Sequence, residues 1–205
     1  MSSRIEVFLR HRASEKYVPA ILIDGVSKKE VERAEKIWRP LIQQAIKQME
    51  TEKRPREHRP QHAHWNWREK HDAVADILAY QMLGVECDGE MQGLMLLKTA
   101  GKFARLESHK SKGLVYVSFV ETAPWNSPLI MQEPRYSQVG TVLLAASINI
   151  SMDLGFKGRI GLHALPQAES WYATHCEMTD LGPDEQYSNL RYFEMSPEQA
   201  ASFLN

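Results

Sequence analysis

Residues 135–144 read RYSQVGTVLL, in which a short polar turn with one glycine leads directly into an apolar helix. The apolar run predicts a helix over residues 138–154, with Ser137 as its N-cap and Gly155 at its C-terminal stop. A helix N-terminus exposes unpaired N–H groups and a partial positive charge, so it is suited to bind a phosphate. Gly140 has two interpretations: it lets a ligand approach the backbone, or it only allows close packing of helix and strand.

Segments on both sides of this helix predict an α/β fold. Residues 113–122 (GLVYVSFVET) are rich in β-branched and aromatic residues, and residues 158–165 contain a second strand-like segment, GRIGLHAL. The order strand, helix, strand predicts a βαβ crossover with two parallel strands. Upstream, Asp88-Gly89 between two apolar runs predicts a β-hairpin. Antiparallel strands that lead into a parallel βαβ unit predict a mixed α/β sheet.

The N-terminal part of the chain contains one strong helix signal, over residues 27–50. Ser27 and Glu30 have the spacing of a capping box. Pro40 is expected to kink or split this helix. The apolar stripe of the predicted helix consists of Val31, Ala34, Trp38, Leu41, Ala45 and Met49.

Shorter elements follow from local patterns. Residues 101–107 are predicted to form a strand, residues 167–175 a short helix, and residues 190–195 a strand. Ser196-Pro197 marks the start of a terminal helix.

Length and composition limit the class of protein. A chain of 205 residues with 43% hydrophobic and 25% charged residues is typical of one globular domain. The net charge of −1 argues against a surface that binds nucleic acid or anionic membrane as a whole. No signal peptide is expected, because the first residues, MSSRIEVFLRHR, contain no sufficiently long apolar stretch, and nowhere do about 18 apolar residues follow one another. Cys87 and Cys176 form no CxxC pattern, which fits the cytoplasm.

The turn resembles a motif of the GNAT-type N-acetyltransferase superfamily. Members carry Arg/Gln-x-x-Gly-x-Gly/Ala at the start of the helix after the fourth strand, where it cradles the pyrophosphate of acetyl-CoA. RYSQVG matches with Arg135 first and Gly140 last, and it departs from the motif at Gln138. VETAPWN resembles the end of the fourth strand, and GLHALPQAESWY resembles the fifth strand and its following helix. The similar span covers about residues 78–182.

This resemblance implies a GNAT-like central mixed sheet in one domain over residues 1–205. Residues 1–67 then form an N-terminal helical and arm region, and residues 78–205 form the core sheet with the cofactor site. The implied reaction is direct transfer of an acetyl group from acetyl-CoA, as co-substrate, to an amine, with no metal. The main chain and turn residues implied to bind acetyl-CoA are Phe119, Val120, Arg135, Tyr136, Ser137, Gln138, Val139, Gly140 and Thr141.

Three side chains are candidates for proton transfer. Tyr172 occupies the family's Tyr position and would protonate the departing thiolate; otherwise it is a Tyr packed on the sheet. Glu121, at the end of the fourth strand, is the leading base; otherwise it is a carboxylate facing solvent. His163 on the neighbouring strand is a competing base, or else a hydrogen-bonded core residue.

Residues 56–71 (REHRPQHAHWNWREKH) support several interpretations. In the resemblance, Trp65 and Trp67 line the acceptor pocket, and Asn126 orients the substrate or a loop. Without the resemblance, the favoured interpretation is a solvated arm whose tryptophans pack back onto the core. The basic and Trp-bearing residues 53–71 also suit single-stranded nucleic acid. A zinc site is disfavoured because no rigid framework fixes its four candidate ligands, His58, His62, His64 and His71.

The sequence therefore predicts an acetyltransferase and leaves the acceptor open among small amines, antibiotics, polyamines, peptide N-termini, lysines and aminoacyl-tRNA. Two other classes stay open: a degenerate acyl-CoA-binding or interaction module, which Gln138 favours, and a nucleic-acid or tRNA-directed protein. Nucleic acid is the less favoured partner, no membrane association is expected, and a homodimer stays open. Cys176 is not proposed as a nucleophile because no His partner follows from its spacing.

Overall fold

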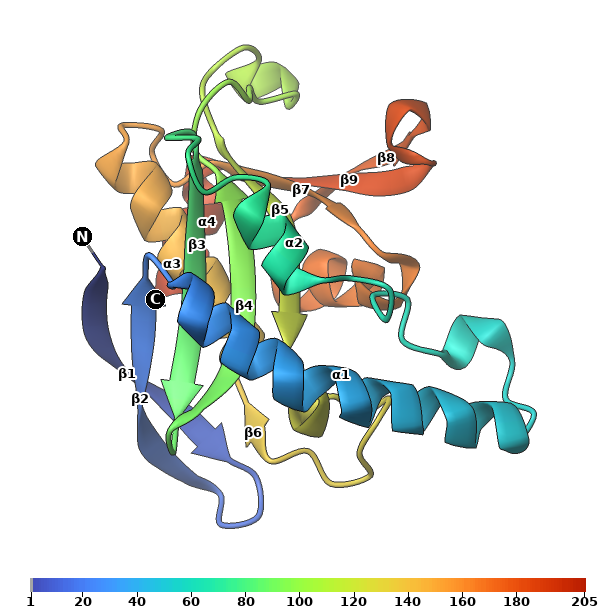
Figure 1. Ribbon diagram of the computed structural model, residues 1–205. Coiled ribbons are helices and arrows are strands. Elements are labelled where there is room, and N and C mark those ends of the chain that lie inside the picture. Colours follow the sequence, from blue (N-terminus) through green and yellow to red (C-terminus); the bar gives the residue numbers. More distant parts are fainter. Residues whose placement is uncertain (1) are drawn as a thin grey trace. The chain divides into compact units, whose positions relative to one another are not determined.

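The computed structural model describes residues 2–205 as a mixed α/β fold (Figure 1). The hydrogen-bonded strand order is β6-β1-β2-β3-β4-β5-β7-β9-β8. The β5–β7 pair is parallel, whereas β1–β2, β2–β3, β7–β9 and β8–β9 are antiparallel, which confirms the predicted mixed sheet. The strands are β1 (Ser3–His11), β2 (Lys16–Asp24), β3 (Tyr80–Cys87), β4 (Glu90–Lys98), β5 (Val115–Thr122), β6 (Tyr136–Ser137), β7 (Ile160–Ala164), β8 (Thr179–Asp184) and β9 (Leu190–Met195).

Helices connect these strands. Several are single turns, and one of the short ones, η5, is a π-helix. The α-helices are α1 (Lys28–Thr51), α2 (Trp67–Asp72), α3 (Val139–Asp153) and α4 (Pro197–Leu204). The short helices are η1 (Arg56–His58), η2 (Glu107–His109), η3 (Pro124–Asn126), η4 (Pro166–Ala168), η5 (Trp171–His175) and η6 (Glu185–Tyr187).

The chain divides into two compact units. β3, β4, β5 and α3 contribute residues to both of them. Unit 1 consists of Met1–Ile77, Met82–Met95 and Val120–Leu143, and unit 2 consists of Leu78–Gln81, Leu96–Phe119 and Leu144–Asn205.

Unit 1 begins with a hairpin that the sequence analysis did not predict. β1 and β2 pair along their whole length, from Ser3 opposite Asp24 to His11 opposite Lys16. β1 buries only Leu9, so it carries little of the apolar content that marks a central strand. The alternation of Ile, Val and Leu at residues 5, 7 and 9 was the usable signal.

Helix α1 follows the hairpin and has the predicted capping box. The Ser27 side chain accepts from the Glu30 backbone N–H, and the Glu30 side chain accepts from the Ser27 backbone. Pro40 does not split the helix, because the apolar stripe continues on both sides of it and compensates for one missing hydrogen bond. Leu41 is exposed, which corrects the predicted stripe. The buried residues of α1 are Val31, Ala34, Trp38, Ile42 and Met49.

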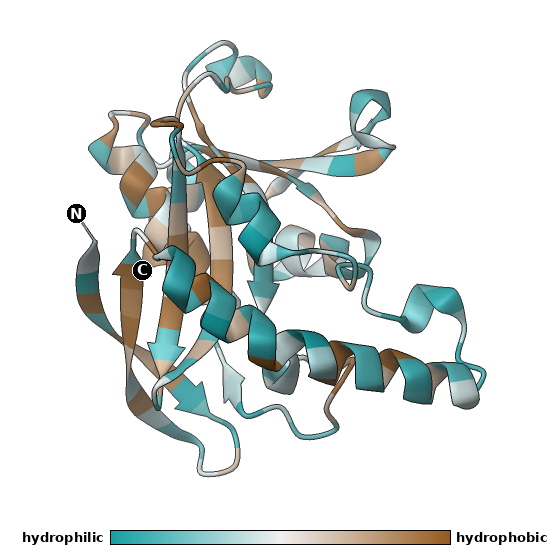
Figure 2. Cartoon of the chain, viewed as in Figure 1, coloured by the Kyte–Doolittle hydropathy of each residue, from teal (hydrophilic) through white to brown (hydrophobic). Residues whose placement is uncertain are grey.

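The predicted β3–β4 hairpin is confirmed. Asp88 and Gly89 have φ values of 53° and 73°, as a two-residue hairpin turn requires. In unit 1, β4 packs closely against the start of α3: a Cβ added to Gly93 would lie 2.6 Å from Val139 Cγ1. Figure 2 shows apolar residues along β3 and β4, whereas α1 is largely hydrophilic outside its stripe.

In unit 2, the predicted parallel pair is confirmed. Val115–Val117 of β5 pair with Ile160–Leu162 of β7, which pairs on its other side with β9. The prediction of a strand at residues 101–107 was wrong, since only an isolated bridge joins Phe103 to Gly113. The chain turns at Gly101, whose φ is 73°. Strand β8 was not predicted, because its exposed, proline-containing sequence TDLGPD lacks a strand pattern.

Among the residues that the structure describes, no helix combines the length and apolar character needed to cross a membrane.

Candidate active site

The turn before α3 leaves backbone N–H groups without intrahelical acceptors. The first i→i−4 bond of the helix runs from Val142 N to Gln138 O, at 2.9 Å. The N–H groups of residues 139–141 precede that bond, so they make up a helix N-terminus of the kind that binds anions. Gln138 has a φ of 72°, the left-handed conformation that favours Gly. Gln138 therefore adopts a backbone conformation that glycine would adopt without strain.

A buried amide network holds this turn in place. Asn126 Oδ1 accepts from Tyr136 N at 2.9 Å, and Asn126 Nδ2 donates to Gln92 Oε1 at 3.0 Å. Trp125 Nε1 donates to the same Gln92 oxygen at 2.7 Å. These contacts attach Asn126 to the loop, and its role toward a substrate stays a prediction. Gln92 was missed, because one Gln in an apolar strand carries no sequence signal for its partners.

The network also limits which predicted cofactor residues have free backbone groups. The Tyr136 N–H is already used by Asn126, and the Tyr136 hydroxyl donates to Asp88 Oδ2. Ser137 pairs with Arg10 of β1. The turn residues that remain for an anion are therefore residues 138–141.

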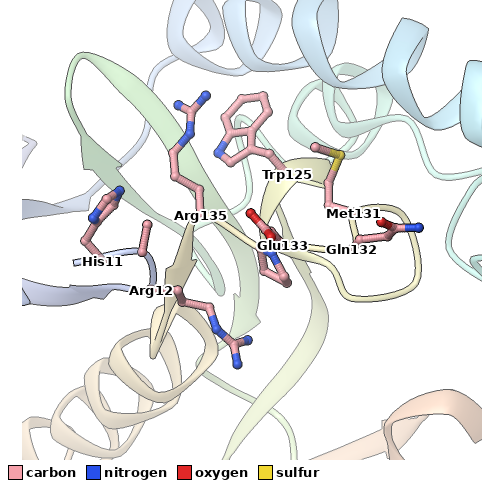
Figure 3. A pocket seen from close by; sticks show the side chains of 9 residues that line it. His11, Arg12, Trp125, Met131, Gln132, Glu133 and Arg135 are labelled. Carbon is pink, nitrogen blue, oxygen red and sulfur yellow. The ribbon is translucent and has the colours of Figure 1, made fainter. Parts of the chain in front are cut away.

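A cleft of about 690 Å³ lies beside the turn, and its walls come from residues 11–13, Trp125 and residues 131–135 (Figure 3). The Arg135 guanidinium forms an exposed ion pair with Glu90 Oε2 at 2.9 Å and lies 5.4 Å from the Trp125 ring centroid. In Figure 3 the side chain of Arg12 extends away from that of Arg135, so the two cations face different sides of the cleft.

Glu121, at the end of β5, is buried in unit 1 rather than exposed to solvent. Its side chain is 0% exposed. Arg39 Nη2 of α1 donates to Oε1 at 3.0 Å, and Trp67 Nε1 donates to Oε2 at 2.6 Å. His62 Nε2 lies 3.6 Å from Oε1.

These surroundings change the acidity of the carboxyl group. Burial raises the pKa of Glu121 to about 7, and the raising effect is only partly offset by Arg39 and by the Trp67 hydrogen bond. Burial, together with Arg39 and His64, lowers the pKa of His62 to about 4. At neutral pH the site therefore holds a neutral imidazole beside a carboxyl group that titrates near 7.

The two tryptophans of the arm have different environments. Trp67 is fully buried, and its indole N–H donates a hydrogen bond to the Glu121 carboxylate. Trp67 therefore helps to fix the position of that carboxylate. Trp65 is half-buried, lies 6.4 Å from the Trp67 ring centroid, and has Lys70 Nζ 5.2 Å from its own ring centroid. The arm thus packs inward at this point, and Trp65 is the member with accessible surface.

Tyr172 lies in unit 2, within the π-helix η5, and is 5% exposed. Its ring contacts those of Trp171 and Phe193, with centroids at 5.0 Å and 6.0 Å. Burial, with a contribution from Cys176, raises the pKa of the Tyr172 phenol, so this side chain stays protonated at neutral pH. Helical segments of this type occur often at functional sites.

His163 belongs to a buried polar cluster of unit 2. Its Nδ1 lies 2.7 Å from Tyr116 Oη and its Nε2 lies 3.0 Å from Asp184 Oδ2. The ring stacks on Tyr187 at 3.8 Å. Burial lowers the pKa of His163, although Asp184 opposes the shift. These contacts match the alternative interpretation, a hydrogen-bonded core histidine.

Two further residues predicted to bind the cofactor, Phe119 and Val120, are half-buried. Phe119 lies in unit 2 and Val120 in unit 1, both on β5. In the described part of the chain, no group of three or more His, Cys, Asp or Glu residues is arranged to hold a metal ion, and this includes the histidines of the arm.

No family model matches the sequence, and no curated protein matches it significantly. Solved structures resemble the chain over most of its length. PaiA N-acetyltransferase from Thermoplasma acidophilum, in complex with coenzyme A, is 12% identical, with a TM-score of 0.50 and coverage of 85% of this chain and 98% of that chain. RimJ from Mycobacterium smegmatis, in complex with CoA-disulfide, is 14% identical, with a TM-score of 0.54 and coverage of 100% and 93%.

The GNAT domain of PAT from S. lividans is 13% identical, with a TM-score of 0.55, and the alignment covers 94% of this chain and 96% of that domain. The chain has the fold of the GNAT-type N-acetyltransferases.

Proposed function

We propose that the protein transfers an acetyl group from acetyl-CoA directly to an amine. One observation carries the proposal: the start of α3 and the backbone of Glu121 both lie against Gly93 of β4. A Cβ added to Gly93 would lie 2.6 Å from Val139 Cγ1 of α3 and 3.4 Å from the Glu121 carbonyl oxygen. The helix start, which is suited to bind a diphosphate, therefore lies near the backbone of Glu121, whose buried carboxyl group has a pKa of about 7.

Two further features support acetyl-CoA as the donor. Gln138 has the left-handed backbone conformation, and the N–H groups of residues 139–141 have no intrahelical acceptor. A turn with these properties is suited to bind a diphosphate. The PaiA and RimJ structures with the same fold contain coenzyme A or its disulfide. The inward packing of Trp67 leaves less of the arm exposed for contact with nucleic acid.

The proposed reaction needs two proton transfers. The acceptor ammonium first loses a proton to the base at Glu121, and the free amine attacks the thioester carbonyl carbon. The tetrahedral intermediate then collapses, the C–S bond breaks, and the coenzyme A thiolate takes a proton from a general acid, the role that the family resemblance implies for Tyr172. Tyr172 regains a proton as the amide nitrogen releases its second one. The products are the N-acetylated amine and coenzyme A, with one proton released overall.

The test is thiol release from acetyl-CoA in the presence of a panel of small amines, polyamines, peptide N-termini and lysine peptides. The wild-type protein should show amine-dependent release with at least one acceptor. Tyr172→Phe should lower kcat by about 100-fold while the Kd for coenzyme A stays within about twofold, since only the proton donor is lost. Tyr80→Phe is the matched control: it removes a hydroxyl from a half-buried tyrosine of β3 and should keep full activity. Thiol release that does not depend on any amine would contradict the proposal.

A further inference from the structure

Three groups touch the Glu121 carboxylate, and they differ in what they can do with a proton. Arg39 and the indole N–H of Trp67 are donors only, and neither releases its proton at neutral pH. His62 is the third neighbour, with Nε2 3.6 Å from Glu121 Oε1. An imidazole both accepts and donates protons, so it alone of the three is able to pass a proton on.

Accessibility separates the members of this pair. The Glu121 side chain is 0% exposed, whereas the His62 side chain keeps 19% of its surface in solvent. A substrate ammonium therefore meets the imidazole before the carboxylate. The arm fixes the ring in this position, because Trp65 packs 5.9 Å from the His62 ring centroid and Arg39 Nη1 donates to the adjacent Ala63 carbonyl at 2.9 Å.

We propose that His62 relays the proton of the acceptor amine to Glu121, so that the His62–Glu121 pair acts as the base. The inference rests on the proposed acetyl transfer and deepens it, since it assigns a second catalytic side chain to the acceptor side. With Nε2 protonated toward Glu121, His62 presents the lone pair of Nδ1 to the substrate.

The acceptor R–NH₃⁺ gives one proton to His62 Nδ1, and His62 gives its Nε2 proton to the Glu121 carboxylate. The products of the step are R–NH₂, a neutral imidazole in the other tautomer, and a neutral carboxylic acid. The proton then leaves Glu121 through His62 to solvent, which restores both groups before the next turnover.

The charges around the pair agree with this direction of transfer. Burial, Arg39 and His64 lower the pKa of His62 to about 4, so the imidazole is neutral at pH 7 and does not keep the proton. Glu121, whose pKa lies near 7, binds the proton more strongly than His62 does. Glu35 Oε2 of α1 lies 3.5 Å from Arg39 Nε. The positive charge of Lys70 on α2 also interacts with the Glu121 carboxylate.

The first experiment uses three variants of the full chain with the best acceptor from the amine panel. His62→Gln and His62→Ala should lower kcat/KM by about 100-fold, with Tm and coenzyme A affinity close to wild type. Added imidazole should restore part of the activity of His62→Ala and should leave His62→Gln unchanged. His58→Gln, an exposed histidine of the same arm, is the control and should keep wild-type activity. Full activity of His62→Gln, or no rescue of His62→Ala by imidazole, would overturn the relay.

The second experiment does not depend on activity. In protein labelled with ¹⁵N-histidine, NMR should show His62 as the Nε2–H tautomer, with ring shifts that move near pH 7 as Glu121 titrates. Glu121→Gln should abolish that movement. A His62 ring that is insensitive to pH near 7, or equally sensitive in Glu121→Gln, shows that the two groups are uncoupled and overturns the proposal.

The two experiments together separate the relay from the reaction. If no amine is acetylated, the proposed function and the relay both fall, even where NMR shows a coupled pair. If acetyl transfer occurs and His62→Ala resists rescue, the relay alone falls.

Discussion

Glu121 illustrates how burial decides the chemistry of a single residue. The sequence placed a carboxylate at the end of a strand and offered two roles for it, a base or a solvated group. The structure surrounds that carboxylate with Arg39, Trp67 and His62 and removes it from water. Desolvation favours the neutral acid more strongly than Arg39 favours the anion, which raises the pKa to about 7.

This shift predicts how Glu121→Gln changes stability with pH. A carboxyl group whose pKa rises from 4.5 to about 7 on folding stabilises the protein fully below pH 4.5 and loses that contribution as the pH rises through 7. Gln mimics the neutral acid at every pH. We therefore expect Glu121→Gln to melt close to wild type at pH 5 and about 5 °C above it at pH 8.

Thermal unfolding of both proteins at the two pH values measures this effect. The surface variant Glu6→Gln, on exposed β1, controls for the removal of one negative charge. An equal Tm difference between Glu121→Gln and wild type at pH 5 and pH 8 would show that Glu121 is not held in its neutral form by folding.

Arg135 gives a second residue-scale prediction. Its guanidinium is paired with Glu90 at the surface, so a bound diphosphate has to compete with an exposed carboxylate. Arg135→Ala should weaken coenzyme A binding about tenfold, or ~1.4 kcal/mol, because one charge-assisted contact is lost. Glu90→Ala should leave the affinity unchanged or increase it. Isothermal titration with coenzyme A measures both, and wild-type affinity in Arg135→Ala would remove this residue from the site.

Among the elements, β4 and α3 depend on each other through Gly93. The first turn of α3 approaches β4 so closely that an added Cβ would contact Val139 at 2.6 Å and Leu143 at 3.0 Å. Side chains at these two positions are buried and belong to the same helix start that presents the open N–H groups. We therefore expect any substitution at Gly93 to displace the proposed anion site.

Gly93→Ala tests this dependence. We expect a loss of about 1–3 kcal/mol in the free energy of unfolding and a lower affinity for coenzyme A, because α3 has to shift to accommodate the methyl group. Gly101→Ala is the control: its Cβ meets no atom within 4 Å, but its φ of 73° makes the variant strained without moving α3. Urea unfolding and coenzyme A titration distinguish the two. Unchanged cofactor affinity in a folded Gly93→Ala would contradict the argument.

At the scale of the whole molecule, ligand binding should raise the free energy of unfolding. A ligand that binds only the native state at 100 times its Kd adds about 2.7 kcal/mol, which corresponds to a rise in Tm of roughly 5–10 °C for a chain of this size. Acetyl-CoA should produce that shift. Acetylpantetheine, which lacks the diphosphate, should produce little shift at the same concentration, because the N–H groups of residues 139–141 gain no anion. Equal shifts by both compounds would place the binding energy outside the turn.

Much of the fold was predictable because its signals are local. The capping box at Ser27 and Glu30, the Asp88-Gly89 turn and the strand–helix–strand order around residues 113–165 each depend on near neighbours in the chain. Segments with weak local patterning were missed, among them β1, which buries one residue, and the exposed strand β8. The prediction at residues 101–107 failed because propensity alone does not provide a partner strand.

The sequence alone determined the α/β fold, the helix start that is proposed to bind an anion, and the list of side chains able to carry protons, because these depend on residue type and short-range spacing. Only the tertiary structure decided which contacts those side chains make. It buried Glu121, brought His62 to it from 59 residues away, enclosed His163 between Tyr116 and Asp184, and engaged Gln92 with the turn. Burial and long-range contacts set the acidity and the partners of each group, and neither is written in the local pattern of the chain.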